Sequence, residues 1–477
     1  MISSRPLVGS AGYCVELVLC TRIITIPVII GKLYTGMTDG EYMRMVDVIA
    51  RKRDGRELTT AEINWFITEY TAGSIPDYQA AALLMAIYLR GMNRRETVDL
   101  TLAMAESGDK LDLHDVAPFV IDKHSSGGVG DKTTLVVQPI AAACGVPVGK
   151  MSGRGLGSSG GTLDKMESIR GWSCTMTLEQ FKRQLADIGV VLAGQTAILA
   201  PADGKLYALR DVTATVASAP LIAASIMSKK LAAGADAMVL DVKMGSGAFM
   251  PTLESARDLA QIMVDIGTDA GRKTVALISD MNQPLGSAVG NALEVKEAIE
   301  TLQGGGPASF WAHCQDVAAH MLLLAGKTSS LEEAKELART VRANGRALSK
   351  FRDMVAAQGG DVAQVDNPAL LPQAKFVEPI LAPRAGYIAA LDTAAIGWAA
   401  VHLGGGRLVK TDKINHAVGF VLPCAVGDKV VVGDVLGTVY ADDVEKLEQA
   451  RREVITAVSW SDTPVAHLPH IYETVTA

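Results

Sequence analysis

The sequence predicts an α/β protein built from a small all-helical domain, a larger α/β domain with a mainly parallel or mixed sheet, and a C-terminal β-rich (α+β) domain. Three observations predict this class. Strand-like apolar runs alternate with helical stretches after residue 112, no strand pattern interrupts the helices before residue 108, and the chain becomes rich in Val, Gly and Pro from about residue 376. The 477 residues are enough to bury an ample core.

The all-helical domain is expected to comprise residues 37–108 and 202–234. Capping-box patterns begin at Thr59 and Asn93, and Asp77 is placed to cap the helix between them. The second segment predicts two helices with no strand between them. We therefore expect it to pack back onto the N-terminal helices.

The α/β domain is expected to comprise residues 112–201 and 235–375. Its strand-like runs fall at 118–122, 146–151, 190–194, 237–243 and 273–279, and its helical stretches at about 133–145, 177–189, 253–269 and 288–302. In this order of elements, ligand-binding loops lie at the carboxyl ends of the strands. Residues 376–477 are expected to form the C-terminal domain. Their pattern of turns and short strands is similar to that of barrel-like domains that carry biotin or lipoyl groups. They contain no Met-Lys-Met at a hairpin tip, so we expect a structural role.

Residues 1–36 are expected to be an N-terminal extension that is not part of the fold. Glu16, Arg22 and Pro27 interrupt its apolar stretch, and no run approaches the ~20 apolar residues that span a bilayer. A net charge of −7 without a basic stripe argues against nucleic-acid binding. The six cysteines have no CxxC spacing, which is typical of a reducing compartment. We therefore expect a cytoplasmic protein with no nucleic-acid or membrane partner.

Two glycine-rich loops, at 123–131 and 152–165, each follow a predicted strand. Glycines let backbone N–H groups turn toward one point, and hydroxyls add donors that suit a phosphate oxygen. The hydroxyls belong to Ser125, Ser152 and Thr162, and the flanking charges to Lys123 and Lys165. For a single loop of this kind an ordinary turn is the more frequent explanation, but two such loops favour an anion site.

Other polar residues near these loops have two interpretations each. His124 either exchanges hydrogen bonds with a substrate oxygen or is an ordinary loop histidine. Arg210 and Lys229 either contact a ligand or lie on the solvated faces of helices. Ser225 lies four residues before Lys229 in a helical stretch, so the two share one face, among small apolar side chains.

Arg154 lies inside the second loop, where it either binds an anion or braces the loop through an ion pair with Asp164 or Glu167. The remaining histidines have no mutual metal-ligand spacing, and we interpret them as structural. They are His114, His313, His320, His402, His416, His467 and His470. We therefore expect no metal site.

Seven motifs together resemble the thymidine and pyrimidine-nucleoside phosphorylase family, most closely the pyrimidine-nucleoside phosphorylases. They lie at 123–131, 152–167, 194–196, 199–203, 210–216, 227–230 and 241–250, and the resemblance extends from Met37 to the last residue. It implies reversible phosphorolysis of uridine, thymidine and deoxyuridine, which yields the free base and a pentose 1-phosphate. It also implies a homodimer joined through the helical domains, with a nucleoside and phosphate as its small-molecule partners.

The resemblance assigns roles to individual residues. It implies that phosphate is bound by Lys123, Ser125, Thr134, Ser152 and Thr162, and the pyrimidine by His124, Arg210, Ser225 and Lys229. Cleavage builds negative charge on the departing base, so His124, Arg210 and Lys229 are the expected catalytic donors. His124 is the candidate general acid.

Two positions bear on rate and substrate range. Ser158 stands where the family usually has histidine, so the rigidity of the loop or the rate is expected to differ. Lys150 precedes Ser152 by two residues, and its ammonium could reach a ribose 2′-hydroxyl. We therefore expect both ribosides and deoxyribosides to be accepted.

No cofactor is expected beyond phosphate as co-substrate, and a monovalent cation that orders residues 130–134 is left open. Other interpretations also stay open. They are a thymidine-specific phosphorylase, a nucleoside 5′-monophosphate phosphorylase, a non-catalytic nucleoside-binding protein, and a phosphoribosyltransferase of the anthranilate type. The last would need Mg²⁺ and a diphosphate-binding loop, which the sequence does not show.

Overall fold

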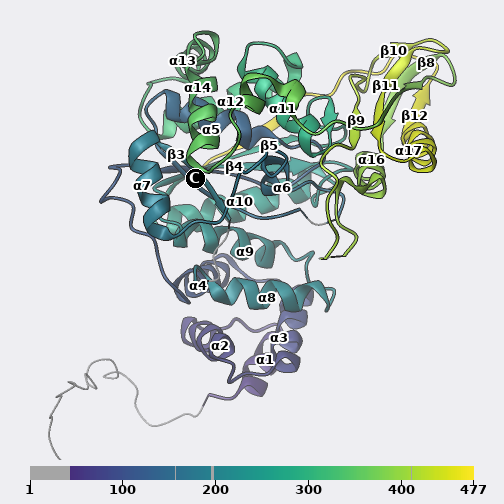
Figure 1. Cartoon of the computed structure of the whole chain (residues 1–477). Coiled ribbons are helices and arrows are strands. Elements are labelled where there is room, and N and C mark those ends of the chain that lie inside the picture. The colour runs from purple at the N-terminus through teal and green to yellow at the C-terminus, as the bar shows by residue number, and fades with distance from the viewer. Residues whose placement is uncertain (1–42, 156, 195–197, 410) are drawn as a thin grey trace, which may run out of the picture. The chain divides into compact units, whose positions relative to one another are not determined.

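The computed structural model describes residues 43–155, 157–194, 198–409 and 411–477 (Figure 1). The chain divides into two units, at 1–43 and 44–477, and all the described helices and strands belong to the second. The predicted extension at 1–36, and Gln195 and Thr196 of the third motif, lie outside the described residues.

The first helices of the fold are α1 (Met45–Arg53), α2 (Thr60–Ala72), α3 (Asp77–Arg90) and α4 (Arg94–Glu106). Thr59 and Asn93 form the predicted capping boxes. Asp77 is not the predicted cap, because Pro76 is the N-cap and Asp77 is the first helical residue. The Asp77 carboxylate instead accepts a hydrogen bond from the Tyr70 hydroxyl at 3.1 Å. That contact joins α2 to the start of α3.

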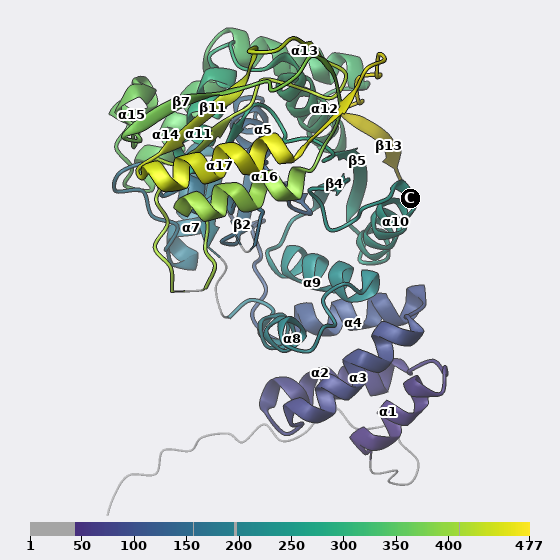
Figure 2. The ribbon, with the colours of Figure 1, turned by 90° about the vertical axis from the view of Figure 1, so that its right-hand side faces the viewer.

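Two later helices, α8 (Pro201–Asp211) and α9 (Ala219–Ala232), lie against this group (Figure 2). Helix α8 contacts α2, α3 and α4, while α9 contacts α4 and α10 (Leu253–Asp269). The α8–α9 pair therefore connects the N-terminal helices to the sheet.

A six-stranded mixed sheet forms the centre of the fold, in the order β13-β5-β4-β1-β2-β3. Its strands are β1 (Ile121–Ser125), β2 (Val148–Ser152), β3 (Val190–Gly194), β4 (Ala237–Met244), β5 (Lys273–Asp280) and β13 (Ile471–Val475). The first five are parallel, and β13 pairs antiparallel with β5. Every residue of β4 is buried, as expected for the centre of a sheet covered on both faces.

Helices cover both faces of this sheet, and the predicted α/β class is confirmed. Helices α5 (Thr133–Ala143), α7 (Leu178–Ile188), α10, α12 (Ala308–Leu324) and α14 (Arg346–Ala357) contact its strands. The same part of the chain also contains α6 (Thr162–Met166), α11 (Asn291–Leu302), α13 (Leu331–Ala343) and α15 (Ala363–Asp366). The predicted helix at 288–302 begins three residues late, because Ala288 and Val289 form strand β6. The predicted strand at 118–122 also begins late, since the Val120 amide donates to the Asp236 carboxylate instead of joining the ladder.

The C-terminal part contains two small sheets and two helices that pack together, α16 (Thr393–Ala400) and α17 (Val444–Thr456). Its strands are β7 (Phe376–Leu381), β8 (Gly386–Leu391), β9 (Gly419–Val421), β10 (Lys429–Val430), β11 (Val435–Ala441) and β12 (Val458–Ser461). The sheets have the orders β10-β8-β12 and β6-β9-β11-β7. Strand β6 therefore joins the C-terminal sheet, while β13 returns to the central one. The sequence pattern predicts neither exchange.

Candidate active site

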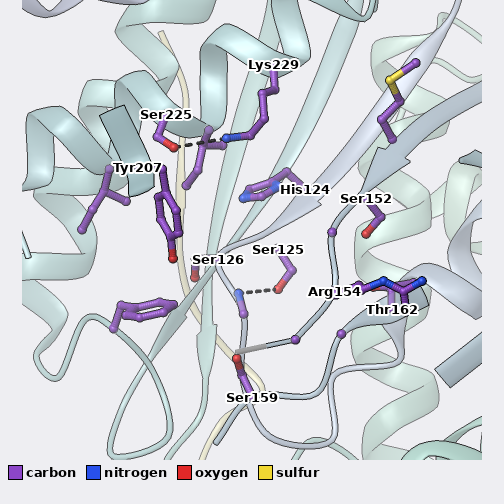
Figure 3. Close-up of a pocket in the computed structure, with 18 of the residues that line it drawn as sticks. His124, Ser125, Ser126, Ser152, Arg154, Ser159, Thr162, Tyr207, Ser225 and Lys229 are labelled. Carbon is purple, nitrogen blue, oxygen red and sulfur yellow. Dashed lines mark hydrogen bonds between the residues drawn. The ribbon is translucent and has the colours of Figure 1, made fainter. Parts of the chain in front are cut away.

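A cavity of about 570 Å³ opens where β1 and β2 end, between the two glycine-rich loops and helices α8 and α9 (Figure 3). Every site residue predicted from the sequence lines it except Lys123 and Lys165, which are both buried. Those that line it are His124, Ser125, Thr134, Lys150, Ser152, Thr162, Arg210, Ser225 and Lys229. The parallel order of β1 and β2 thus brings both loops to one edge of the sheet.

The first loop is held by the end of β4. The Ser126 amide donates to the Asp241 carbonyl at 3.0 Å, and the Ser126 hydroxyl accepts from the Lys243 amide at 2.8 Å. The backbone then turns through Gly127, whose φ is +95° and whose amide donates to the Ser125 hydroxyl at 3.3 Å. These bonds fix the Ser125 side chain at the cavity (Figure 3).

The second loop is braced by Arg154, as one of the two interpretations predicted. Its guanidinium pairs with Glu167 at 2.6 Å and with Asp164 at 3.2 Å. Asp164 also accepts from the Gly155 amide at 2.7 Å and pairs with Arg407 at 2.9 Å. One buried carboxylate therefore ties the loop to α6 and to the C-terminal part.

Ser158 lies against helix α16. A Cβ added to Gly397 would come within 2.5 Å of the Ser158 carbonyl oxygen and 2.9 Å of its Cβ. The loop and the helix are thus in close contact, and the small side chain at 158 meets a glycine there. The second loop therefore rests on the C-terminal part at this point.

A group of fully buried charges lies under the first loop. The Lys123 ammonium is 3.4 Å from Asp241 and 4.0 Å from Asp131, and no described group accepts a hydrogen bond from it. Lys243 pairs with Asp241 at 2.8 Å, and the His313 ring lies 3.0 Å from the same carboxylate. Burial alone would raise the pKa of Asp131, but Lys123 and Lys243 hold it well below its usual range. Asp131 is therefore ionised.

His124 lies between the loops and the α9 side chains (Figure 3). Burial, together with the positive charges of Lys230 and Lys150, lowers the pKa of His124 well below its usual value. The imidazole is therefore neutral near pH 7. A neutral ring donates a hydrogen bond through one nitrogen, which favours the role of hydrogen-bond donor to the base. The general-acid role stays a prediction.

This state of His124 can be measured by NMR. Its ring is expected to stay neutral as the pH falls from about 8 to about 5.5, where an ordinary histidine gains its proton. The expected result is a ring-proton signal that is lost in His124→Asn and does not shift over this range. An inflection near the ordinary pKa of about 6.5 would contradict the argument.

Helix α9 contributes the opposite wall. The Lys229 ammonium donates to the Ser225 hydroxyl at 3.1 Å, so the predicted shared face is confirmed. It also pairs with Asp203 on α8. Burial lowers the pKa of Lys229, while Asp203 opposes that shift. The side chain is 23% exposed, so it is held between the protein and the cavity.

Arg210 lines the cavity, but its guanidinium donates to main-chain carbonyls. The acceptors are Thr215 at 3.3 Å, Val216 at 2.7 Å and Leu221 at 2.9 Å. These bonds fix the connection between α8 and α9. In this structure Arg210 therefore positions the wall that carries Lys229, and its predicted contact with the base stays a prediction.

Lys150 is buried at the floor of the cavity. Its ammonium donates to the Lys123 carbonyl at 2.5 Å and lies 3.8 Å from Asp122. Burial, with the charge of the neighbouring Lys230, lowers the pKa of Lys150 to about 7. Lys150 thus lies beside the first glycine-rich loop.

The residues that line the cavity and were not predicted from the sequence include Asp203, Tyr207 and Phe249. Helical spacing could have found the first two, because Asp203, Tyr207 and Arg210 follow the i, i+4, i+7 pattern of one helix face. Phe249 follows the end of β4, and no local pattern singles it out. No group of His, Cys, Asp and Glu within the described ranges has the arrangement of a metal site.

Comparison with known proteins assigns the class and then the family. Residues 46–108 match the helical bundle domain of a glycosyl transferase family, and residues 117–348 match its a/b domain. The fold agrees with anthranilate phosphoribosyltransferase from Thermus thermophilus, with a TM-score of 0.54 and 23% identity, over 65% of this chain and 99% of that one. The protein is therefore an enzyme of the glycosyl transferase class.

Residues 387–461 match the pyrimidine nucleoside phosphorylase C-terminal domain. The chain is 52% identical to the pyrimidine-nucleoside phosphorylase of Geobacillus stearothermophilus, over 91% of this chain and 100% of that protein. It is 54% identical to the enzyme of the same name from Bacillus subtilis, over 84% of this chain and 92% of that one. The chain belongs to the pyrimidine-nucleoside phosphorylase family.

Proposed function

We propose that this protein catalyses the reversible phosphorolysis of uridine, thymidine and deoxyuridine to the free base and (deoxy)ribose 1-phosphate. One observation supports this most directly. Hydroxyl-rich glycine loops and the Ser225–Lys229 pair face a single cavity from opposite sides, with His124 between them (Figure 3). Such a cavity can hold phosphate against the sugar on one side and a pyrimidine ring on the other.

The proposed mechanism divides the work between the two sides. Phosphate is already a nucleophile, so the loops need only orient it toward the anomeric carbon. Breaking the glycosidic bond leaves negative charge on the base. A charged donor from Lys229 and a neutral donor from His124 stabilise that charge more in the transition state than in the substrate.

The test is release of base from uridine and from thymidine, each with and without phosphate. Phosphate-dependent release from both is the expected result. Release from thymidine alone would favour a thymidine-specific phosphorylase. Absence of release, with thermal stabilisation by nucleoside intact, would favour a nucleoside-binding protein. Absence of release, together with Mg²⁺-dependent transfer of a phosphoribosyl group from its diphosphate to a free base or amine and release of diphosphate, would favour a phosphoribosyltransferase.

The proposal that ribosides are accepted depends on Lys150. Replacing it with methionine is expected to lower kcat/KM for uridine by about tenfold, the value of one lost hydrogen bond, with little change for thymidine. The measurement is the ratio of the two kcat/KM values in the wild type and in Lys150→Met. An unchanged ratio would exclude Lys150 as the selector, whatever happens to the absolute rates.

We further propose a cytoplasmic homodimer that joins through the helical domain. Exposed apolar side chains on α3 support the dimer, since Tyr78 is 75% exposed and Leu89 71% exposed, on one face of the helix. Four cysteines in the described residues are free thiols, which suits a reducing compartment. No helix among the described residues has the length and apolar character to cross a bilayer.

A further inference from the structure

Lys132 does not line the cavity, yet it is completely buried next to it. Its ammonium donates to the Leu285 carbonyl at 2.6 Å and to the Ala288 carbonyl at 3.0 Å. It also pairs with the Glu297 carboxylate at 2.6 Å. The ring of Phe310 lies 4.9 Å from the same nitrogen. A single positive charge is thus enclosed by three oxygen atoms and an aromatic face.

Hydrogen bonds that do not involve the Lys132 ammonium also hold these oxygens in place. The Glu297 carboxylate, on helix α11, accepts from the Ser287 amide at 3.0 Å and from the Ala288 amide at 2.8 Å. Segment 285–288 is therefore tied to α11 with its carbonyls turned inward. Space around the nitrogen is limited, because a Cβ at Gly286 would meet it at 2.8 Å and the carboxylate at 2.1 Å.

The same segment holds the first glycine-rich loop. The Leu285 amide donates to the Val129 carbonyl at 3.1 Å. Gly130 has a φ of +73°, and a Cβ there would lie 2.9 Å from the Leu285 carbonyl oxygen and 3.0 Å from that of Ala288. The two carbonyls that contact the ammonium therefore also press against the first glycine-rich loop at Gly130. The positive charge between these two carbonyls therefore sets the position of the first glycine-rich loop.

Two carbonyl oxygens and a carboxylate at such distances are the surroundings that a K⁺ or NH₄⁺ ion takes in proteins. The sequence left open a monovalent cation that orders residues 130–134, and the residues present do not fit one, since the Lys132 ammonium fills the place. We propose that Lys132 is a tethered substitute for a free monovalent cation, so that phosphate binding in this protein is independent of K⁺ and Na⁺. The kinetic part of this proposal rests on the proposed function.

The first test compares the wild-type protein in KCl, NaCl and choline chloride at equal ionic strength. The expected result is the same melting temperature and the same KM for phosphate in all three salts. Choline is too large for the space that a Cβ at Gly286 would already crowd. A fall in both stability and phosphate use in choline chloride, reversed by KCl, would overturn the proposal.

The second test is Lys132→Ala, which removes the ammonium and leaves the carbonyls and Glu297 around an open space. In choline chloride the variant is expected to lose stability and to show a KM for phosphate raised by about tenfold or more. KCl or NH₄Cl is expected to restore both, because a bound cation stabilises the folded state by mass action. Failure of every cation to raise the melting temperature of Lys132→Ala would contradict a cation-shaped site.

Two further variants test whether rescue by KCl is specific to the site around Lys132. Lys132→Ala combined with Glu297→Gln lacks the negative charge and is expected to show no rescue by KCl. Lys52→Ala breaks another buried ion pair, in which the Lys52 ammonium donates to both carboxylate oxygens of Glu96, at 2.8 and 2.9 Å, rather than to main-chain carbonyls. It is expected to be destabilised equally in all salts. Because melting temperature needs no turnover, these comparisons remain decisive if phosphorolysis itself is not observed.

Discussion

Replacing Lys229 with methionine is expected to lower kcat/KM for uridine and thymidine alike by about 10²- to 10³-fold, the usual cost of removing one donor to a developing anion. The ammonium is held at the cavity by Ser225 and Asp203, and methionine keeps the volume without the charge. The measurement is steady-state base release at saturating phosphate, with thermal stabilisation by phosphate as a second readout. That stabilisation is expected to persist, because the glycine-rich loops, where we propose that phosphate binds, lie on the opposite side of the cavity.

A matched control separates this effect from loss of a surface charge. Lys205 also lies on the helical wall, on α8, but its ammonium donates to the Tyr70 and Thr71 carbonyls, away from the cavity. Lys205→Met is expected to retain the wild-type kcat/KM within about twofold. Equal losses in both variants, or loss of stabilisation by phosphate in Lys229→Met, would show that Lys229 is not a specific contact of the base.

Lys123→Met is expected to produce the complementary defect, with kcat/KM for phosphate lowered by about 10²- to 10³-fold. Its ammonium lies under the loop without a hydrogen-bond acceptor among the described residues, close to Asp131 and Asp241. Its removal leaves two buried carboxylates with less compensation. The free energy of unfolding is therefore expected to fall by about 3 to 5 kcal/mol. Phosphate titration of the rate, together with denaturant unfolding, measures both effects.

The double variant Lys123→Met with Asp241→Asn distinguishes charge balance from phosphate binding. Removing one carboxylate is expected to recover stability, while use of phosphate stays low, because the cation under the loop is still missing. Recovery of both would mean that Lys123 acts only by neutralising Asp241. Thermal stabilisation by nucleoside is expected in every variant of this pair.

Much of the central sheet could be predicted from the sequence, because its signals are local. Strand β3 and helix α10 have the predicted bounds, 190–194 and 253–269. A short buried run of Val and Leu leaves little alternative to a strand, and a capping residue fixes the first turn of a helix. The two glycine loops could be predicted for the same reason, since their residues adjoin in sequence.

The parts that were missed depend on distant partners. Strand β13 is a short, partly polar segment that pairs with β5, far from it in the sequence. The carbonyls of Thr215, Val216 and Leu221, which accept hydrogen bonds from the Arg210 guanidinium, could not be predicted from helical spacing either. Nothing in the sequence near Lys132 indicates Glu297 as its partner. Propensity and spacing describe a residue's neighbours along the chain, and these contacts are decided by the fold.

Strand β13 can pair with β5 only near the end of synthesis of the chain. Ser279 of β5 leaves the ribosome long before its partner Ile471, an interval of roughly 10–40 s at ordinary rates of elongation. Throughout that interval the edge of the nascent sheet offers unpaired amides and carbonyls to other chains. The last strand therefore closes an edge that is open to aggregation while translation continues.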